Sequence, residues 1–143
     1  MDKARIEFLT KDFIRGFPAF CNLEVLSVGR GRFESQLRPN TQHAQRDGYV
    51  HAGMLATMAD HTAGYAAYTL VEKHISILTI ELKINYFKPA VGERIVCRSK
   101  VIHQGRTILV AESELFAITA ESEKLVAKAT VTLMAIANRA AVV

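Results

Sequence analysis

The sequence predicts an α+β fold in which a curved antiparallel sheet wraps around one long central helix. The chain has 143 residues, of which 50% are hydrophobic and 22% charged, so it can bury one core and is neither disordered nor fibrous. The segment 52–70 is apolar on nearly every side, and strand-like alternation follows it. One apolar helix among strands is buried only if the sheet curves around it. We expect a single domain over residues 1–143, with an N-terminal helix in 1–19 and the core in 20–136.

The N-terminal region predicts one amphipathic helix followed by a hairpin. Residues 3–15 place apolar side chains on one helical stripe and charges elsewhere, and Gly16 and Pro18 end the helix. The segments 23–28 and 32–38 read as two strands because a short Gly-Arg-Gly turn joins them. The helix is expected to act as a lid or to pack on the core.

The rest of the chain predicts a buried helix and four long strands. The polar run 39–48 is expected to be a loop, and the helix 52–70 after it to be fully buried. In 77–88 every second residue is apolar, which indicates a strand with one buried face. We expect this strand to begin a meander whose other members are 93–103, 107–118 and 124–136.

Composition and missing motifs exclude several classes of protein. The net charge of +4 is spread along the chain without a basic tract, so no nucleic-acid partner is expected. No membrane partner is expected either, because Asp60 and His61 interrupt the one long apolar segment at its middle. Cys21 and Cys97 form no C-x-x-C pair and the N-terminus has no signal-peptide core, so we expect a cytoplasmic location. The histidines and acidic residues lack the spacing of metal ligands.

The start of the central helix predicts a site that binds an oxyanion. His51-Ala52-Gly53 opens the helix, and the amides of its first turn point out of the helix end with the positive end of the dipole. The amides of Ala52 or Gly53 could therefore polarise a carbonyl group. Small residues there leave room for that carbonyl.

Asp60 is the candidate catalytic carboxylate. It lies seven residues after Gly53, so both fall on the same helix face. One interpretation is that Asp60 only hydrogen-bonds a neighbouring loop; we favour a general base or nucleophile beside the amides. Thr57 and Gly64 share this face at one-turn spacing: Thr57 could touch a substrate, and Gly64 could let a strand pack closely.

Residues 45–67 carry a family resemblance. The segment QRDGYVHAGMLATMADHTAGYAA resembles the signature of hotdog-fold thioesterases, in particular the phenylacetate-degradation-type (PaaI-like) acyl-CoA thioesterases. That signature runs from Asn or Gln through Gly to His-Gly-Gly and an acidic residue nine positions after the His. The matching residues here are Gln45, Gly48, His51-Ala52-Gly53 and Asp60. Ala52 replaces the first Gly of the usual pair, and the similarity covers about residues 20–136.

The resemblance implies hydrolysis of an acyl-CoA thioester to free acid and CoA. Asp60 would activate water or attack directly, while the Ala52 and Gly53 amides stabilise the oxyanion. Gln45 and His51 would orient the carbonyl or the water; alternatively, His51 hydrogen-bonds the backbone and Gln45 shapes its loop. No cofactor is implied, since CoA is part of the substrate.

The resemblance also suggests CoA contacts and an assembly. Lys88, Arg106 and Thr107 correspond to places where hotdog thioesterases meet CoA phosphates, although a solvated hairpin tip is an equal interpretation for the last two. A long edge strand could pair with a second copy, which favours a homodimer or homotetramer. In such an assembly Asp60 and the loop 45–53 could come from different subunits.

Two other functions remain open on the sequence. The first is a non-catalytic acyl-CoA-binding or sensing module, against which the buried carboxylate of Asp60 argues. The second is a hotdog dehydratase or hydratase, whose acid–base His and acidic residue would occur in a different order from His51 and Asp60.

Overall fold

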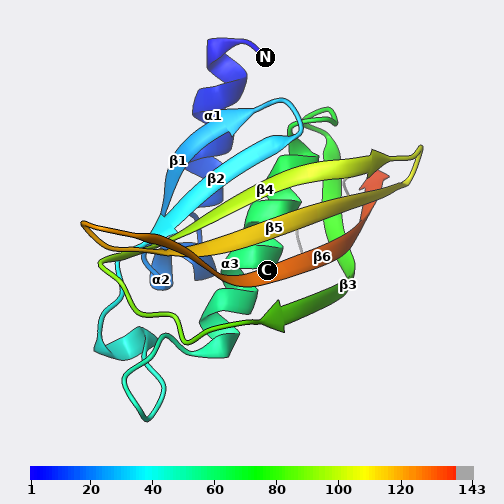
Figure 1. The fold of residues 1–143 in the computed structure, drawn as a ribbon. Helices are drawn as coiled ribbons and strands as arrows, with labels where there is room; N and C mark the ends of the chain where they lie inside the picture. The colour runs from blue at the N-terminus through cyan, green and yellow to red at the C-terminus, as the bar shows by residue number, and fades with distance from the viewer. Residues whose placement is uncertain (138–143) are drawn as a thin grey trace.

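The computed structural model describes residues 1–137 as a six-stranded antiparallel sheet curved around one long helix (Figure 1). This confirms the predicted α+β architecture. The helices are α1 (Lys3–Phe13), α2 (Phe17–Phe20) and α3 (Ala52–Tyr68), and a 3-10 turn lies at Thr41–His43. The strands are β1 (Leu23–Gly29), β2 (Arg32–Leu37), β3 (Ile75–Tyr86), β4 (Arg94–Gln104), β5 (Ile108–Ile118) and β6 (Glu123–Ala137).

The order of the strands differs from the meander that the sequence predicts. The sheet runs β1-β2-β4-β5-β6-β3, so β3 pairs with β6, and β4 pairs with β2. The link 87–93 therefore carries the chain from one edge of the sheet to its other half. Because the crossover places β4 beside β2, the β1–β2 hairpin becomes part of one continuous sheet that covers α3. An isolated two-stranded hairpin would be only marginally stable.

Strand β3 is one edge of the sheet, and a bulge between Thr79 and Glu81 changes which residues face α3. Before the bulge, Ile77 packs on the core and Thr79 turns to the helix; after it, Leu82 resumes the inner face. Leu78 and Ile80 point away and are 52% and 53% exposed. The expectation of one unbroken apolar face on this strand is thus wrong, because the extra residue of a bulge reverses the alternation.

Helix α3 is buried on one side only, contrary to the expected full burial. Its core face is made mostly of small residues and methionines: Met54, Leu55, Met58, Ala59, Thr62, Ala63, Ala66 and Ala67. Hydroxyl groups of the sheet also bind this face, since Ser35 Oγ lies 2.7 Å from Thr62 Oγ1 and Ser113 Oγ donates to the Ala59 carbonyl at 2.7 Å. On the opposite side Asp60 and Gly64 stay partly exposed, because α1 covers only part of it.

Helix α1 packs across α3 near its second half. Asp2 caps α1 by accepting a hydrogen bond from the Arg5 amide, and Leu9 and Phe13 are buried. The Phe13 ring packs against Phe33 and Tyr65. Helix α1 ends at Phe13, before Gly16. Pro18, which was expected only to end that helix, stands in the first turn of the one-turn helix α2, where proline is favoured. Within residues 1–137, no helix is long and apolar enough to cross a membrane.

Candidate active site

The N-terminus of α3 is capped by His51. Its Nδ1 accepts a hydrogen bond from the Gly53 amide at 2.8 Å. A Cβ atom on Gly53 would lie 3.0 Å from that nitrogen, so glycine leaves room for the cap. His51 therefore takes part in backbone hydrogen bonding, and the Gly53 N–H, one of the two predicted oxyanion donors, already has a partner.

The Ala52 amide is the donor that remains. Within residues 1–137 its N–H makes no hydrogen bond, whereas its carbonyl accepts one from the Tyr86 hydroxyl at 2.9 Å. Ala52 is exposed and lines a cavity of about 350 Å³ together with Gln45 and Lys88. A free amide at the positive end of the helix dipole can bind an oxyanion.

Gln45 lies in the same cavity but is partly engaged by its own loop. Its side-chain carbonyl oxygen accepts a hydrogen bond from the Asp47 amide, and its backbone N–H donates to the Tyr49 carbonyl at 2.7 Å. These bonds hold the 45–49 turn, as the loop-shaping interpretation of Gln45 expects. The structure thus brings Gln45, Ala52 and Lys88 together.

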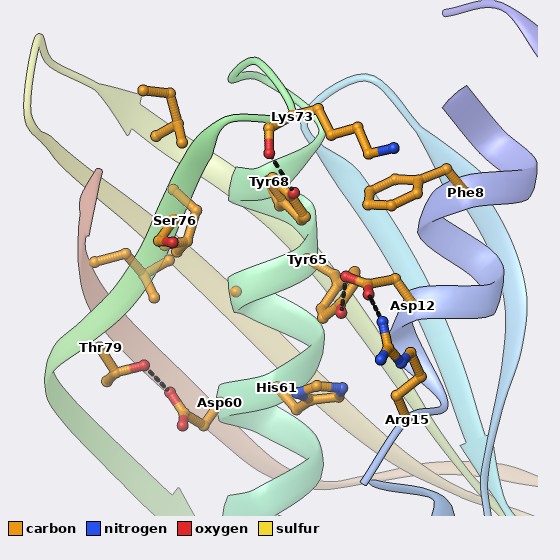
Figure 2. A pocket seen from close by; sticks show the side chains of 14 residues that line it. Phe8, Asp12, Arg15, Asp60, His61, Tyr65, Tyr68, Lys73, Ser76 and Thr79 are labelled. Atoms are coloured by element: carbon orange, nitrogen blue, oxygen red, sulfur yellow. Dashed lines mark hydrogen bonds and ion pairs between the residues drawn. The ribbon is translucent and has the colours of Figure 1, made fainter. Parts of the chain in front are cut away.

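Asp60 lies in a different cavity, of about 510 Å³, between α3, β3 and α1 (Figure 2). Its Oδ1 accepts a hydrogen bond from the Thr79 hydroxyl at 2.6 Å. Sequence reasoning missed Thr79, because strict alternation assigned it to the outer face of β3. The β3 bulge turns it to Asp60, and a hydroxyl in an otherwise apolar stretch of strand was the one available signal.

Gly64 lines the Asp60 cavity, one turn further along α3. Among the described residues 1–137, nothing lies within 4 Å of the position that a Cβ atom on Gly64 would take. Within one protomer, therefore, no described strand packs closely on Gly64.

Thr57 belongs to neither of these two cavities. Its hydroxyl donates to the Gly53 carbonyl at 2.9 Å, and its side chain lines a third, smaller cavity with His51 and Gly53. Asp60 and Gly53 lie on one helix face, but seven residues at 1.5 Å each separate them by about 10 Å along the axis. A single protomer therefore does not bring the carboxylate to the helix N-terminus.

Arg106 and Thr107 lie in the turn between β4 and β5. Their side chains are exposed, and the Thr107 carbonyl accepts a hydrogen bond from the Ala135 amide at 2.8 Å. Neither residue lines the cavity at Asp60 or the one at Ala52. In one protomer they form a solvated hairpin tip.

His61 and Tyr65 join α3 to α1 beside Asp60. The Phe13 carbonyl accepts a hydrogen bond from His61 Nε2 at 2.9 Å, and the Tyr65 hydroxyl donates to Asp12 at 2.8 Å. Burial lowers the pKa of His61, although the bond to Phe13 and the charges of Asp60 and Asp12 oppose this shift. Burial and then the hydrogen bond to Asp12 raise the pKa of Tyr65, so its hydroxyl remains a donor.

The lowered pKa of His61 predicts a loss of stability in mild acid. The unfolded chain takes up the His61 proton near pH 6.5, and the folded chain only at lower pH. The free energy of unfolding therefore falls as the pH drops below about 6.5, by at most about 1.4 kcal/mol per pH unit until the folded group also titrates. Urea unfolding between pH 7.5 and 5 measures this. We expect His61→Gln to remove this pH dependence and the exposed control His74→Gln to keep it. An equal change of the free energy of unfolding with pH in the wild type and in His61→Gln would contradict the prediction.

Within residues 1–137, no group of three His, Cys, Asp or Glu side chains could hold a metal ion. The candidate site includes hydrogen-bond donors and a carboxylate. The carboxylate is half-buried, and the free amide lies at a helix N-terminus.

Comparisons with known proteins agree with this fold. Residues 47–132 match the model of the family described as the thioesterase superfamily. The crystal structure of a thioesterase family protein from Silicibacter pomeroyi has a TM-score of 0.87 and 34% identity, covering 91% of this chain and 96% of that one. The 1,4-dihydroxy-2-naphthoyl-CoA hydrolase of Listeria monocytogenes is 27% identical over 77% of this chain and 87% of its own. Acyl-coenzyme A thioesterase 13 of Mus musculus is 29% identical over 64% of this chain and 65% of its own. The hotdog fold that the sequence suggested is confirmed.

Proposed function

This chain belongs to the thioesterase superfamily, and on that premise we propose that it hydrolyses an acyl-CoA thioester to a free acid and CoA. One observation carries the proposal. The Asp60 carboxylate is held by the Thr79 hydroxyl at 2.6 Å inside a cavity large enough for an acyl group. A binding module does not need a carboxylate fixed at the wall of this cavity, whereas a hydrolase can use it as a general base or nucleophile.

Each group has a role in the reaction. Thr79 occupies one oxygen of Asp60, which leaves the other oxygen to accept a proton from water or to attack the carbonyl carbon itself. In the direct route the C–S bond breaks as Asp60 forms a mixed anhydride with the acyl group, and water then hydrolyses the anhydride to the free acid. In the water route the new C–O bond forms as the Ala52 N–H binds the oxyanion. The C–S bond then breaks, and the proton taken by Asp60 goes to the departing thiolate. Thiols ionise near pH 8.5, so this leaving group needs no strong acid.

We assign the binding of CoA itself to the cavity at Ala52. Gln45 and Lys88 line that cavity, and an ammonium group suits a phosphate or the polar arm of CoA. Arg106 and Thr107 contact the CoA phosphates in this proposal only if a second copy brings the hairpin tip near that cavity.

The proposed enzyme is a homodimer, or a homotetramer built from such dimers. A carboxylate about 10 Å from the helix N-terminus cannot share a substrate carbonyl with an amide there. The exposed edge strand β3 and the half-exposed side of α3 can both meet a second copy, whose Ala52 would then face Asp60. Cys21 and Cys97 are free and buried, which suits the cytoplasmic location that we propose.

The function is tested by following free-thiol release from short-chain, medium-chain and aromatic acyl-CoAs. Hydrolysis of at least one of them far above the rate without protein supports the proposal. Binding of these esters without turnover of any of them would overturn it in favour of a binding module.

A further inference from the structure

The cavity at Ala52 lies between two stretches of chain that are far apart in the sequence. One wall comes from the 45–50 loop and the start of α3, and the other comes from the end of β3 and the turn at 87–90. In Figure 1 the end of β3 lies beside the start of α3. A thioester bound between these walls reaches the free Ala52 N–H only where their spacing suits it, so the contacts that fix this spacing matter for the reaction.

Hydrogen bonds join the two walls. The Val50 amide donates to the Ala90 carbonyl at 3.2 Å, and the Tyr86 hydroxyl donates to the Ala52 carbonyl at 2.9 Å. The first bond is made by backbone atoms and does not depend on a particular side chain. The second depends on one hydroxyl group, and it binds the residue whose N–H is the free oxyanion donor. Tyr86 is therefore the side chain that ties this donor to β3.

Ala52 needs such a tie because it is the first residue of α3. The N–H groups of a first turn have no partner within the helix, and helix ends fray. The Ala52 side chain is one methyl group, which makes no hydrogen bond of its own. The peptide group that follows Ala52 is nevertheless held at both polar atoms, since Tyr86 donates to its oxygen and its N–H, that of Gly53, donates to His51 Nδ1 at 2.8 Å. Tyr86 thus limits the rotation of Ala52 while the N–H of that residue stays free.

The position of Tyr86 is itself well defined. Beyond the bulge of β3, Tyr86 follows Leu82 and Ile84 on the face of the strand that turns to the helix. Tyr86 also pairs with Ala127 of β6, so the strand is held at the place where this hydroxyl reaches across to α3. Burial raises the pKa of Tyr86, so its hydroxyl stays protonated and remains a donor at neutral pH.

We propose that Tyr86 is a positioning residue for the reaction, because its hydrogen bond to the Ala52 carbonyl holds the Ala52 N–H in the direction that the oxyanion requires. This inference rests on the proposed function. A donor lowers the barrier most when it is aimed in advance at the charge that develops, and a donor that must first be reoriented loses much of this effect. The bound ester gains less from the same alignment, since the charge on its oxygen develops only in the transition state. Loss of the Tyr86 hydroxyl should therefore slow the chemical step and leave binding of the ester nearly unchanged.

The test uses Tyr86→Phe, which removes the hydroxyl and keeps the ring. The substrate is whichever of the short-chain, medium-chain and aromatic esters the wild type hydrolyses fastest. We expect kcat to fall about tenfold, the effect of one hydrogen bond, while KM changes by less than about twofold. The same substitution is then made in Ala52→Pro, where the N–H is missing but the carbonyl remains. There we expect Tyr86→Phe to lower kcat by less than about twofold, because the donor that it positions is gone.

A matched control separates positioning from a general effect on the fold. Tyr68→Phe also removes a hydrogen bond from a tyrosine hydroxyl to a backbone carbonyl, that of Lys73 at 3.0 Å, beyond the other end of α3. Its effect on kcat should be the same factor with and without Ala52→Pro. An unchanged kcat in Tyr86→Phe, or an equal fall in both backgrounds, would overturn the inference while the thioesterase function stands. Absence of thiol release from every ester by the wild type would instead refute the proposed function, and this inference with it.

Discussion

Asp60→Asn is expected to lower the rate of thiol release by a factor of about 100 to 10,000, the range for a positioned acid–base group. Asparagine keeps the shape of the side chain and can still accept the Thr79 hydrogen bond. It can neither take a proton from water nor form an anhydride. The fall should therefore appear in kcat at saturating acyl-CoA, while the unfolding transition stays close to that of the wild type.

The controls for this variant separate chemistry from folding. Glu121→Gln removes an exposed carboxylate from the β5–β6 turn and should leave kcat unchanged. Thr79→Val keeps Asp60 but removes its donor, so we expect a smaller loss, of about tenfold. Full turnover by Asp60→Asn would remove this carboxylate from the mechanism.

Ala52→Pro is expected to lower kcat by a factor of about 100 to 1,000, the range for losing one oxyanion donor. The substitution removes only the N–H of the first helical residue, which has no partner within residues 1–137. Proline is favoured at this position of a helix. His51 before it has φ −60° and ψ 136°, a conformation that residues preceding proline adopt readily. The helix should therefore form as in the wild type.

Ala52→Val is the matched control for the added bulk. It keeps the N–H and places a side chain of similar size at the same exposed position. We expect it to lose far less activity than Ala52→Pro, in the same thiol-release measurement. Equal losses in the two variants would mean that bulk, and not the missing donor, slows the reaction.

The two variants together also test the shared site. If each site combines Asp60 of one protomer with Ala52 of the other, unfolding and refolding a mixture of Asp60→Asn and Ala52→Pro should restore activity. Random pairing leaves about a quarter of all sites with both intact groups, so about a quarter of wild-type activity is expected. Activity no higher than the mean of the separate variants would show that the groups do not meet across an interface.

The fold class and the central helix could be predicted from the sequence because both follow from local pattern. Apolar residues all round 52–70 indicate a helix among strands, and His51 marks the observed start of α3. The order of the strands was not accessible in this way. Neighbours along the chain are often neighbours in a sheet, but the link 87–93 crosses from β3 at one edge to a place beside β2.

The candidate site was only partly predictable, for reasons of geometry at single residues. A one-residue bulge turned Thr79 toward Asp60, and alternation over a whole strand does not reveal a single inserted residue. Helical spacing placed Gly53 and Asp60 on one face, but a shared face does not imply proximity over two turns. The hydrogen bond from the Gly53 amide to His51 could be predicted from the sequence, because His51 lies two residues before Gly53, where its side chain can reach the amide.

The hydroxyl groups that bind the core face of α3 also affect the direction in which Asp60 points. Alanines such as Ala59 and Ala63 make the middle of this helix face smooth, and small side chains interlock only weakly with a sheet. The hydrogen bond between the Ser35 and Thr62 hydroxyls and the one that Ser113 donates to the Ala59 carbonyl are directional, so they help to fix the rotation of the helix about its axis. The sheet thereby keeps the carboxylate on the far side pointed at Thr79, and this orientation depends on small polar side chains that are fully buried, namely Ser35, Thr62 and Ser113.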